Sequence, residues 1–428
     1  MKNFQIIILI VFIVAAIVGV LAFSGALPIG GSGNKAGSGG TVVIWGTAKA
    51  SNISKALDDF NRVNTAYTVK YVQKQPESFN QDLLEALASG KGPDLFFISD
   101  DLVHEYSDKI FTIPYKSFPL SVFNSDFAGA GSIFLSSQGI LAFPIAIDPL
   151  MMYYNRSILN ANGVVYPPTY WDELPALSTT LSKKDDSGQI KQSAFGLGQF
   201  SNINNAKDIL SALFMQAGNP IVAQNSGVFV STLNQSSNLS QVLASYTDFA
   251  DPLKAVYSWN KSLPNSQNAF SAENLAFYFG LGSEEKILSE KNPNENFGIA
   301  PLPQIRGASF KLTSGRITGV AVSAFSKNLN SAFMVADLLA TGDFAKEYDS
   351  AENLAPARRN LLASPAPNDP YQSLIYSSAL YAKSWLDPSP VDTDKVFKDM
   401  VENVLSGNFT PEAAINDASA KLNVLLSK

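Results

Sequence analysis

With 428 residues, of which 46% are hydrophobic and 16% charged, the chain is long enough for two globular lobes and a tail. Its net charge of −6, with no Lys/Arg-rich cluster, argues against a broad nucleic-acid-binding surface. The absence of cysteine excludes disulfides and thiolate zinc sites, and a single histidine, His104, leaves little room for a His-based metal site or a Ser-His-Asp triad. We therefore expect no metal and no cofactor, and we interpret His104 as a residue on a helix surface.

The chain begins with a strongly apolar segment. Residues 4–23, FQIIILIVFIVAAIVGVLAF, are apolar apart from Gln5 and follow the positively charged start MKN. As a helix, this segment would span roughly 30 Å, which matches the hydrocarbon thickness of a bilayer. Because the segment is longer than the core of most cleaved signal peptides, we predict that residues 1–26 form an uncleaved signal anchor, a transmembrane helix with Lys2 inside and the folded part extracytoplasmic. Cleavage near Ala26 followed by secretion is the alternative.

A linker follows the apolar segment. Residues 27–40, LPIGGSGNKAGSGG, are rich in glycine and serine and show no apolar period. This composition is typical of a flexible tether, which would hold a folded body near the membrane. No cysteine follows the apolar segment, so attachment through a lipidated cysteine is excluded.

The first part of the folded region alternates between strands and helices. β-Branched and aromatic runs predict strands at 41–45, 67–73 and 93–99, and apolar residues at helical spacing predict helices at 52–64 and 79–92. This alternation is the signature of a parallel sheet with helices on both faces.

Polar residues follow two of these predicted strands. Thr47 and Lys49 come after the first strand, and Asp100 and Asp101 come after the third. In parallel sheets, ligands lie beyond the carboxyl ends of the strands. We therefore expect these four residues to face the same crevice.

The rest of the chain contains further elements. Strands are predicted at 297–304 and 316–325, and helices at 330–348, 394–407 and 411–428. For the last helix, Pro411 occupies the first helical position and Thr410 precedes it as the expected N-cap.

An aspartate stands in the middle of the apolar stretch FPIAIDPLMMYYNRSIL, residues 143–159. A buried carboxylate without a partner would cost several kcal/mol, so Asp148 must meet water, a ligand or another protein group. A crevice would supply water or a ligand. A structural role, either beside a nearby lysine or as the cap of a following helix, is the alternative.

Several segments, taken together and in order, resemble one family. They are VVIWGTA, GKGPDLFFISDD, FPIAIDPLMMYYNRSIL, PPTYWDEL, FGIAPLPQ, ITGVAVSAFSKN and LAPARRN. Each is weak alone, but their order behind an export segment is similar to that of family 1 extracellular solute-binding proteins, the maltose-binding-protein-like sugar receptors of ABC importers. The resemblance covers nearly all of residues 41–428.

The resemblance implies an α/β chain with the two-lobe, periplasmic-binding-protein-like (type II) fold. Each lobe would be a mostly parallel sheet flanked by helices. Residues 41–145 and 319–352 would form the N-terminal lobe, and residues 146–318 and 353–428 the C-terminal lobe. A carbohydrate would be held between the lobes, which close about the crossing segments.

The resemblance also suggests polar contacts with the ligand. Asp148 matches a cleft-facing acid on the first crossing segment, and Asp101 matches an acid that binds sugar hydroxyls. Asp100 could do the same, although one of the two neighbouring acids is expected to cap the helix that follows. Thr47 and Lys49 lie near a polar loop that contacts the ligand in the family.

Aromatic side chains are the other candidates, because sugar rings stack on them through C–H faces. Among the tryptophans we expect Trp171 to be structural and Trp45 at most to touch the cleft. Trp259 and Trp385 are the predicted stacking platforms, with packing as the alternative for each.

The tyrosines are predicted to divide between core and cleft. We expect Tyr153 to lie in the core, Tyr154 at the cleft rim, and Tyr278 to present an aromatic ring to the ligand. Gly282 and Ile98 stand where the maltose receptor has tryptophans, and this departure argues against a linear glucose oligomer.

The favoured function is therefore that of a membrane-tethered carbohydrate receptor without catalytic activity. It would act as a monomer and deliver solute to ABC permease subunits, with no role for nucleic acid. One alternative keeps the fold but delivers the ligand to a sensory partner. Another is an anchored glycan hydrolase that uses Asp101 and Asp148 as paired carboxylates.

Overall fold

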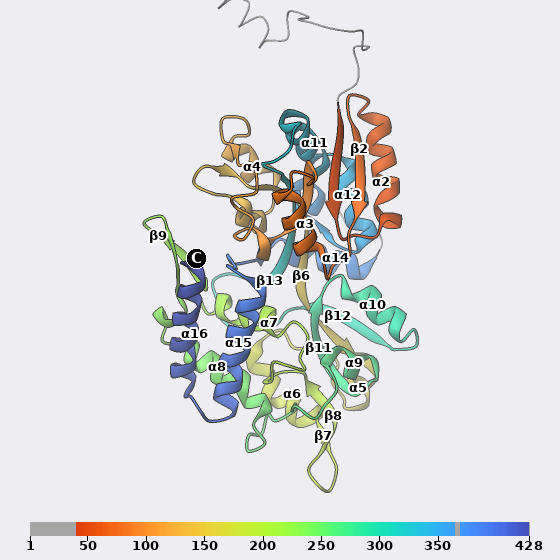
Figure 1. The fold of residues 1–428 in the computed structure, drawn as a ribbon. Coiled ribbons are helices and arrows are strands. Elements are labelled where there is room, and N and C mark those ends of the chain that lie inside the picture. Colours follow the sequence, from red (N-terminus) through yellow and green to blue (C-terminus); the bar gives the residue numbers. More distant parts are fainter. Residues whose placement is uncertain (1–39, 364–368, 428) are drawn as a thin grey trace, which may run out of the picture. The chain divides into compact units, whose positions relative to one another are not determined.

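The computed structural model describes residues 40–363 and 369–427 (Figure 1). Its strands are β1 (Thr41–Gly46), β2 (Thr68–Gln73), β3 (Leu95–Ser99), β4 (Ile113–Pro114), β5 (Gly139–Ile140), β6 (Ala142–Asn155), β7 (Lys183–Lys184), β8 (Ile190–Phe195), β9 (Val222–Asn225), β10 (Val228–Ser231), β11 (Leu275–Leu281), β12 (Phe297–Pro301), β13 (Thr313–Val322), β14 (Ala355–Pro356) and β15 (Ala382–Lys383).

The helices cover these strands and connect them. The α-helices are α2 (Ala50–Val63), α3 (Phe79–Ala88), α4 (Leu120–Asp126), α5 (Arg156–Ala161), α6 (Leu174–Leu181), α7 (Ala206–Gln216), α8 (Leu239–Thr247), α9 (Ser266–Ser271), α10 (Glu284–Lys291), α11 (Leu329–Thr341), α12 (Asp343–Glu352), α13 (Arg359–Leu362), α14 (Pro370–Ala379), α15 (Pro390–Leu405) and α16 (Pro411–Leu426). Short 3-10 helices are η1 (Asp100–Leu102), η2 (Gly129–Phe134), η3 (Trp171–Glu173), η4 (Leu233–Gln235) and η5 (Asp248–Ala250).

Within the described residues, most strands join one sheet in the order β2-β1-β3-β13-β6-β11-β8-β7, with β12 and β14 beside β6 and β15 beside β13. We call β2, β1 and β3 the first strand group, and β11, β8, β7 and β12 the second strand group. Strand β1 pairs in parallel with both β2 and β3, as the alternation of strands and helices predicts. Its inward side chains Val42 and Ile44 are fully buried.

Two long strands connect the groups. The first half of β6 pairs with β13, and its second half pairs with β11 and β12. Strand β13 in turn pairs with β3. The predicted lobe boundary after residue 145 falls inside β6, and the one after residue 318 falls at a register shift in β13. The division into two lobes at these points stays a prediction.

The prediction of mostly parallel sheets is wrong, because the sheet is mixed. Strand β13 runs antiparallel to both β3 and β6, and β6 runs antiparallel to β11 and β12. The reason is topological, since a chain that passes from one strand group to the other must return in the opposite direction.

The predicted helix 330–348 is two helices, α11 and α12, interrupted at Gly342. The backbone of Gly342 is extended, with ψ of −172°. A Cβ at this position would lie 2.6 Å from the Leu338 carbonyl oxygen, so glycine permits the close approach. At the other end of the chain, the expected cap of α16 is confirmed, since the Thr410 hydroxyl accepts a hydrogen bond from the Ala413 N–H at 3.2 Å.

The predicted signal anchor at 1–26 and nearly all of the linker at 27–40 lie outside the described residues. In residues 40–363 and 369–427, none of the helices has the length and apolar character that a membrane span requires.

Candidate ligand-binding site

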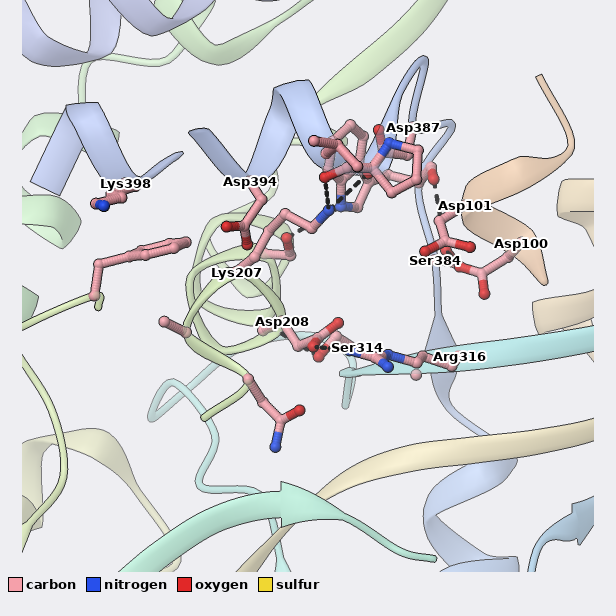
Figure 2. A pocket seen from close by; sticks show the side chains of 18 of the residues that line it. Asp100, Asp101, Lys207, Asp208, Ser314, Arg316, Ser384, Asp387, Asp394 and Lys398 are labelled. Carbon is pink, nitrogen blue, oxygen red and sulfur yellow. Dashed lines mark hydrogen bonds and ion pairs between the residues drawn. The ribbon is translucent and has the colours of Figure 1, made fainter. Parts of the chain in front are cut away.

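A polar cavity of about 660 Å³ lies where β3 ends, close to the start of α7 and to β13 (Figure 2). Segment 383–398, which includes the start of α15, forms another side of the cavity. Its lining residues are Asp100, Asp101, Phe200, Ser201, Ile203, Asn205, Ala206, Lys207, Asp208, Ser211, Ser314, Gly315, Arg316, Lys383, Ser384, Trp385, Asp387, Pro390, Val391, Asp394 and Lys398.

Asp100 lies at the edge of this cavity and is 7% exposed. Its carboxylate accepts a hydrogen bond from the Ile317 N–H at 2.8 Å and another from the Ser384 hydroxyl. Burial and the neighbouring Asp101 raise the pKa of Asp100, while these two hydrogen bonds oppose the rise. Asp100 therefore binds protein groups with both of its oxygens.

Neither acid caps a following helix, contrary to expectation for one of them. Both lie within η1, whose N-cap position is Ser99 and carries no side-chain cap. Asp101 instead accepts a hydrogen bond from the Ser99 hydroxyl, while it lines the cavity.

Arg316 extends from β13 towards α7 and forms an ion pair of 3.1 Å with Asp208. The Asp208 carboxylate is the main reason that the pKa of Arg316 is raised. The Ser314 hydroxyl donates to the Asp208 carbonyl oxygen at 2.9 Å. This hydrogen bond and the ion pair both connect β13 to the start of α7. Since the Arg316 side chain is 55% exposed, part of its guanidinium can still meet a ligand.

A second, less exposed ion pair joins α7 to the segment that precedes α15. The Lys207 ammonium lies 2.9 Å from Asp387 and 3.2 Å from the Thr393 hydroxyl. The Asp387 side chain is only 4% exposed. Burial raises the pKa of Asp387, and the Lys207 charge opposes that shift.

Trp385 contributes an aromatic ring to the cavity wall. Its ring stacks on Phe397 with centroids 5.9 Å apart, and its indole N–H donates to the Ser211 hydroxyl at 3.0 Å. Trp385 is 8% exposed and lines the cavity, so one part of its surface is open to a ligand.

Four charged side chains complete the lining without forming ion pairs among the described residues. They are Asp101, Lys383, Asp394 and Lys398. Figure 2 shows Asp394 and Lys398 on the helix that borders the cavity. The cavity thus offers both carboxylates and ammonium groups.

Asp148, expected in the cleft, does not line this cavity. It is 8% exposed and lies in β6, where it accepts hydrogen bonds from the Ser283 N–H at 3.0 Å and the Ser283 hydroxyl at 2.6 Å. Burial raises the pKa of Asp148 to about 6, and the Ser283 hydrogen bonds oppose the shift. In this structure Asp148 holds the start of α10, which corresponds to the structural alternative.

The alternative function of an anchored glycan hydrolase requires Asp101 and Asp148 to act together as paired carboxylates. Asp101 lines the cavity and Asp148 does not, so the structure gives no support to a hydrolase built on this pair.

Two predicted aromatic contacts lie in the core of the second strand group. Trp259 is fully buried, and its indole N–H donates to the Asn202 side chain at 3.1 Å. Tyr278 is 1% exposed, and its hydroxyl donates to Glu284. Neither ring is available as a stacking platform here.

Thr47, Lys49 and Tyr154 are also absent from the lining of this cavity. Lys49 occupies the N-cap position of α2. Tyr154 is half-buried beneath the Arg156 guanidinium, 5.8 Å from its ring centre. Of the predicted residues, the structure therefore brings together Asp100, Asp101 and Trp385.

The sequence predicts that Tyr153 and Trp171 are structural and that His104 lies on a helix surface. Tyr153 is fully buried, which confirms its core position, and its hydroxyl donates to the Leu281 carbonyl oxygen at 2.6 Å. Trp171 packs against Phe279 and donates to the Gln216 side chain at 2.7 Å. The helix-surface prediction for His104 is wrong, because it lies in a turn with its ring edge-on to Phe229.

Sequence reasoning missed the start of α7 and the charges of segment 383–398. The stretch NAKDIL carries no motif, and Arg316 lies within an ordinary strand pattern. The signal that could have found them is the density of charged residues around Trp385 in AKSWLDPSPVDTDK.

A second cavity, of about 990 Å³, shares Lys383, Ser384 and Trp385 with the polar one. Its other lining groups are mainly apolar and aromatic, among them Tyr115, Phe229 and Phe310. The polar cavity is therefore the better candidate for a hydroxyl-rich ligand.

The sequence of the chain matches the profile of a known protein family. The profile of the family described as bacterial extracellular solute-binding protein matches residues 45–343. The chain belongs to this family. This solute-binding protein is therefore a binding protein and not an enzyme, and its family is extracellular, so the folded part belongs outside the cytoplasm.

Similar proteins agree with this membership. A binding protein of Brucella abortus (strain 2308) is 21% identical over 407 residues, which cover 91% of this chain and 93% of that protein. A solved cyclo/maltodextrin-binding protein, complexed with maltotetraose, has a TM-score of 0.73 at 20% identity, covering 91% of this chain and 98% of that one. A cyclic alpha-maltosyl-1,6-maltose binding protein from Arthrobacter globiformis has a TM-score of 0.74 at 16% identity, with 90% and 99% covered. These similarities show the periplasmic-binding-protein-like fold.

Proposed function

We propose that this solute-binding protein is the extracytoplasmic receptor of an ABC importer and binds a carbohydrate in the polar cavity. Two kinds of finding support the proposal. The family is one of solute receptors, and solved structures with the same fold hold maltotetraose, mannotriose and acarbose. The cavity of this chain has the chemistry that such ligands need.

The observation that carries the proposal is the composition of the cavity wall. Asp101 and Asp394 can accept hydrogen bonds from hydroxyl groups, and Arg316, Lys383 and Lys398 can donate to them. Trp385 adds an aromatic surface for the C–H face of a sugar ring. Charges of both signs suit a neutral, hydroxyl-rich solute better than a phosphorylated one.

Binding would favour a closed arrangement of the two lobes. A ligand that meets Asp101 after β3 and Asp394 on α15 joins segments from both predicted lobes. It therefore binds the closed form better, and hinge closure is the transition expected of periplasmic binding proteins. Moving the population from mostly open to mostly closed requires a difference of about 5.5 kcal/mol in binding free energy.

The test is a thermal-shift screen of the full chain in a detergent without a sugar headgroup. Maltotetraose, mannotriose and acarbose are the first probes, followed by a wider sugar panel. A probe at 100 times its Kd should raise the free energy of unfolding by about 2.7 kcal/mol. Absence of stabilisation by any carbohydrate, together with stabilisation by another class of solute, would contradict the proposal.

A pair of variants on α15 locates the site. Lys398→Met removes a cation from the cavity wall and should weaken binding of the probe that stabilises best. Lys395→Met is the matched control, because Lys395 is 72% exposed and pairs with Asp399 outside the cavity. Equal affinities of the two variants would place the ligand elsewhere.

We also propose that residues 1–26 anchor the receptor in the cell membrane, that residues 27–40 tether it, and that it acts as a monomer beside the permease. The apolar length of residues 4–23 supports the anchor. Membrane fractions should retain the full chain after a high-salt wash, and a chain without residues 1–26 should not sediment with them.

A further inference from the structure

One carboxylate connects three segments that are far apart in the sequence. Asp100 follows β3, accepts a hydrogen bond from Ile317 of β13, and accepts another from Ser384, which is 284 residues away. The side chain is almost fully buried. It therefore links the end of the first strand group to the strand that crosses between groups and to the wall of the cavity.

Ser384 lies in a part of the cavity wall that has little regular secondary structure. The preceding strand β15 pairs with β13 over two residues only, Ala382 and Lys383. No helix or strand follows Ser384 until Pro390 begins α15. Side-chain contacts therefore have to hold the intervening segment in place.

Trp385, the next residue, is held by α7 and α15. Its indole N–H binds Ser211 of α7, and its ring stacks on Phe397 of α15. The residue before it, Ser384, binds Asp100 beyond β3. The segment 383–385 is thus held on one side by Asp100 and on the other by α7 and α15.

We propose that Asp100 is a positioning residue, which sets the affinity of the cavity through Ser384 by fixing segment 383–385 against β3. This inference rests on the proposed function, since it concerns the same cavity. It differs from the sequence-based expectation that Asp100 binds ligand hydroxyls directly. Both carboxylate oxygens of Asp100 already accept hydrogen bonds from the protein, so of these two neighbouring acids Asp101 is the one that we assign to the ligand.

The charge of Asp100 matters to this role. The charged groups that act on it are Asp101 beside it, which disfavours its ionised form, and Arg316, which favours that form. Burial also disfavours ionisation, so the pKa of Asp100 lies above its ordinary value. As the pH falls, Asp100 takes up a proton and becomes neutral, so the Ser384 hydroxyl no longer donates to a charged acceptor and its hydrogen bond to Asp100 weakens.

The test compares five variants with the wild-type full chain by calorimetric titration with the tightest-binding of maltotetraose, mannotriose and acarbose. Ser384→Ala should weaken binding about tenfold, the scale of a hydrogen bond to a charged group. Ser384→Thr keeps the hydroxyl and should recover most of the affinity. Ser377→Ala, on the exposed face of α14, is the control and should bind as the wild type does.

The pH profile separates positioning from mere structural support. Wild-type affinity should fall between pH 8 and pH 5, and Asp100→Asn should show the low affinity already at pH 8 with a flatter profile. Asp148 also titrates near Arg316, so an Asp148→Asn chain, which should keep the Asp100-dependent part of the profile, is measured in parallel.

Unchanged affinity in Ser384→Ala would overturn the inference while leaving the proposed function intact. If Asp100→Asn loses binding in that case, Asp100 is a direct ligand contact. If none of the probes binds the wild type, the proposed function fails and this inference fails with it.

Discussion

At the scale of single residues, the carboxylates show how burial and partners decide a role. Asp148 and Asp100 both lie in the interior, yet no ion pair below 4 Å neutralises either of them in the described part of the chain. Ser283 provides two donors to the first, and Ile317 and Ser384 provide two to the second. Donors of this kind stabilise a buried charge only in part, so the pKa of each acid is raised.

Asp148 leads to a prediction about stability and pH. Because its pKa is about 6 in the folded protein, the folded state holds a proton more firmly than the unfolded state does. The contribution of Asp148 to the free energy of unfolding should therefore become more favourable as the pH falls from 8 towards 4, and at pH 8 the ionised Asp148 should destabilise the protein.

Asp148→Asn should remove this effect. An amide can accept from the Ser283 N–H and donate to the Ser283 hydroxyl, so we expect the variant to be about 3 kcal/mol more stable than the wild type at pH 8 and similar at pH 4. Urea unfolding at the two pH values measures the difference. Asp186→Asn, on the surface, is the control, and equal effects of both variants at pH 8 would refute the argument.

At the scale of elements, the cavity depends on how α7 and α15 meet. The two helices begin close to each other, and Lys207 of α7 binds Asp387 just before α15. Thr393 of α15 also binds Asp387, at 2.8 Å. Two helix starts and one connecting segment are therefore organised around a single buried ion pair.

Lys207→Met should break this arrangement. The variant leaves the Asp387 charge buried without its cation, which costs about 3–5 kcal/mol of unfolding free energy. Adding Asp387→Asn removes the charge and should recover much of the loss. Chemical denaturation at pH 7 measures both.

Lys395→Met, on α15, serves as the control for the loss of an exposed ion pair. It breaks an exposed i,i+4 pair with Asp399, for which we expect a change below about 1 kcal/mol. A loss as large as that of Lys207→Met would show that the burial of an ion pair does not determine its contribution to stability here.

At the scale of the whole folded region, three chain segments pass close together between the strand groups. Strand β6 pairs there with both β13 and β14. Bending at these segments would change the distance between the predicted lobes without disturbing the core of either group. This geometry makes closure measurable.

The absence of cysteine allows a clean test of closure. Val122→Cys and Val424→Cys place two fluorophores on exposed positions of different predicted lobes, away from the residues that line the cavity. Energy transfer between the two fluorophores should increase when a carbohydrate that binds the protein is added to saturation. Val165→Cys with Leu253→Cys, both exposed within residues 146–318, should show no change, and a constant signal in the first pair with ligand bound would contradict closure.

The order of elements could be read from the sequence because it depends on local patterns. Apolar spacing located α2 and α3 and the strands β1 to β3, and the Thr410–Pro411 pair located the start of α16. The segments that resemble the family, in their order, also identified its fold. The break at Gly342 was missed, since a helical apolar pattern continues on both sides of it.

The cavity could not be predicted in the same way, because its residues come from strands and helices that only the tertiary structure brings together. Asp101, Arg316 and Trp385 are separated by long stretches of chain, and nothing near Arg316 in the sequence indicates its neighbours. The tertiary structure also decided which aromatic residues are buried, and placed Trp259 in the core and Trp385 at the cavity. Local patterns thus determined the elements and the family, while long-range packing determined the site, because side-chain burial depends on neighbours that are distant in sequence.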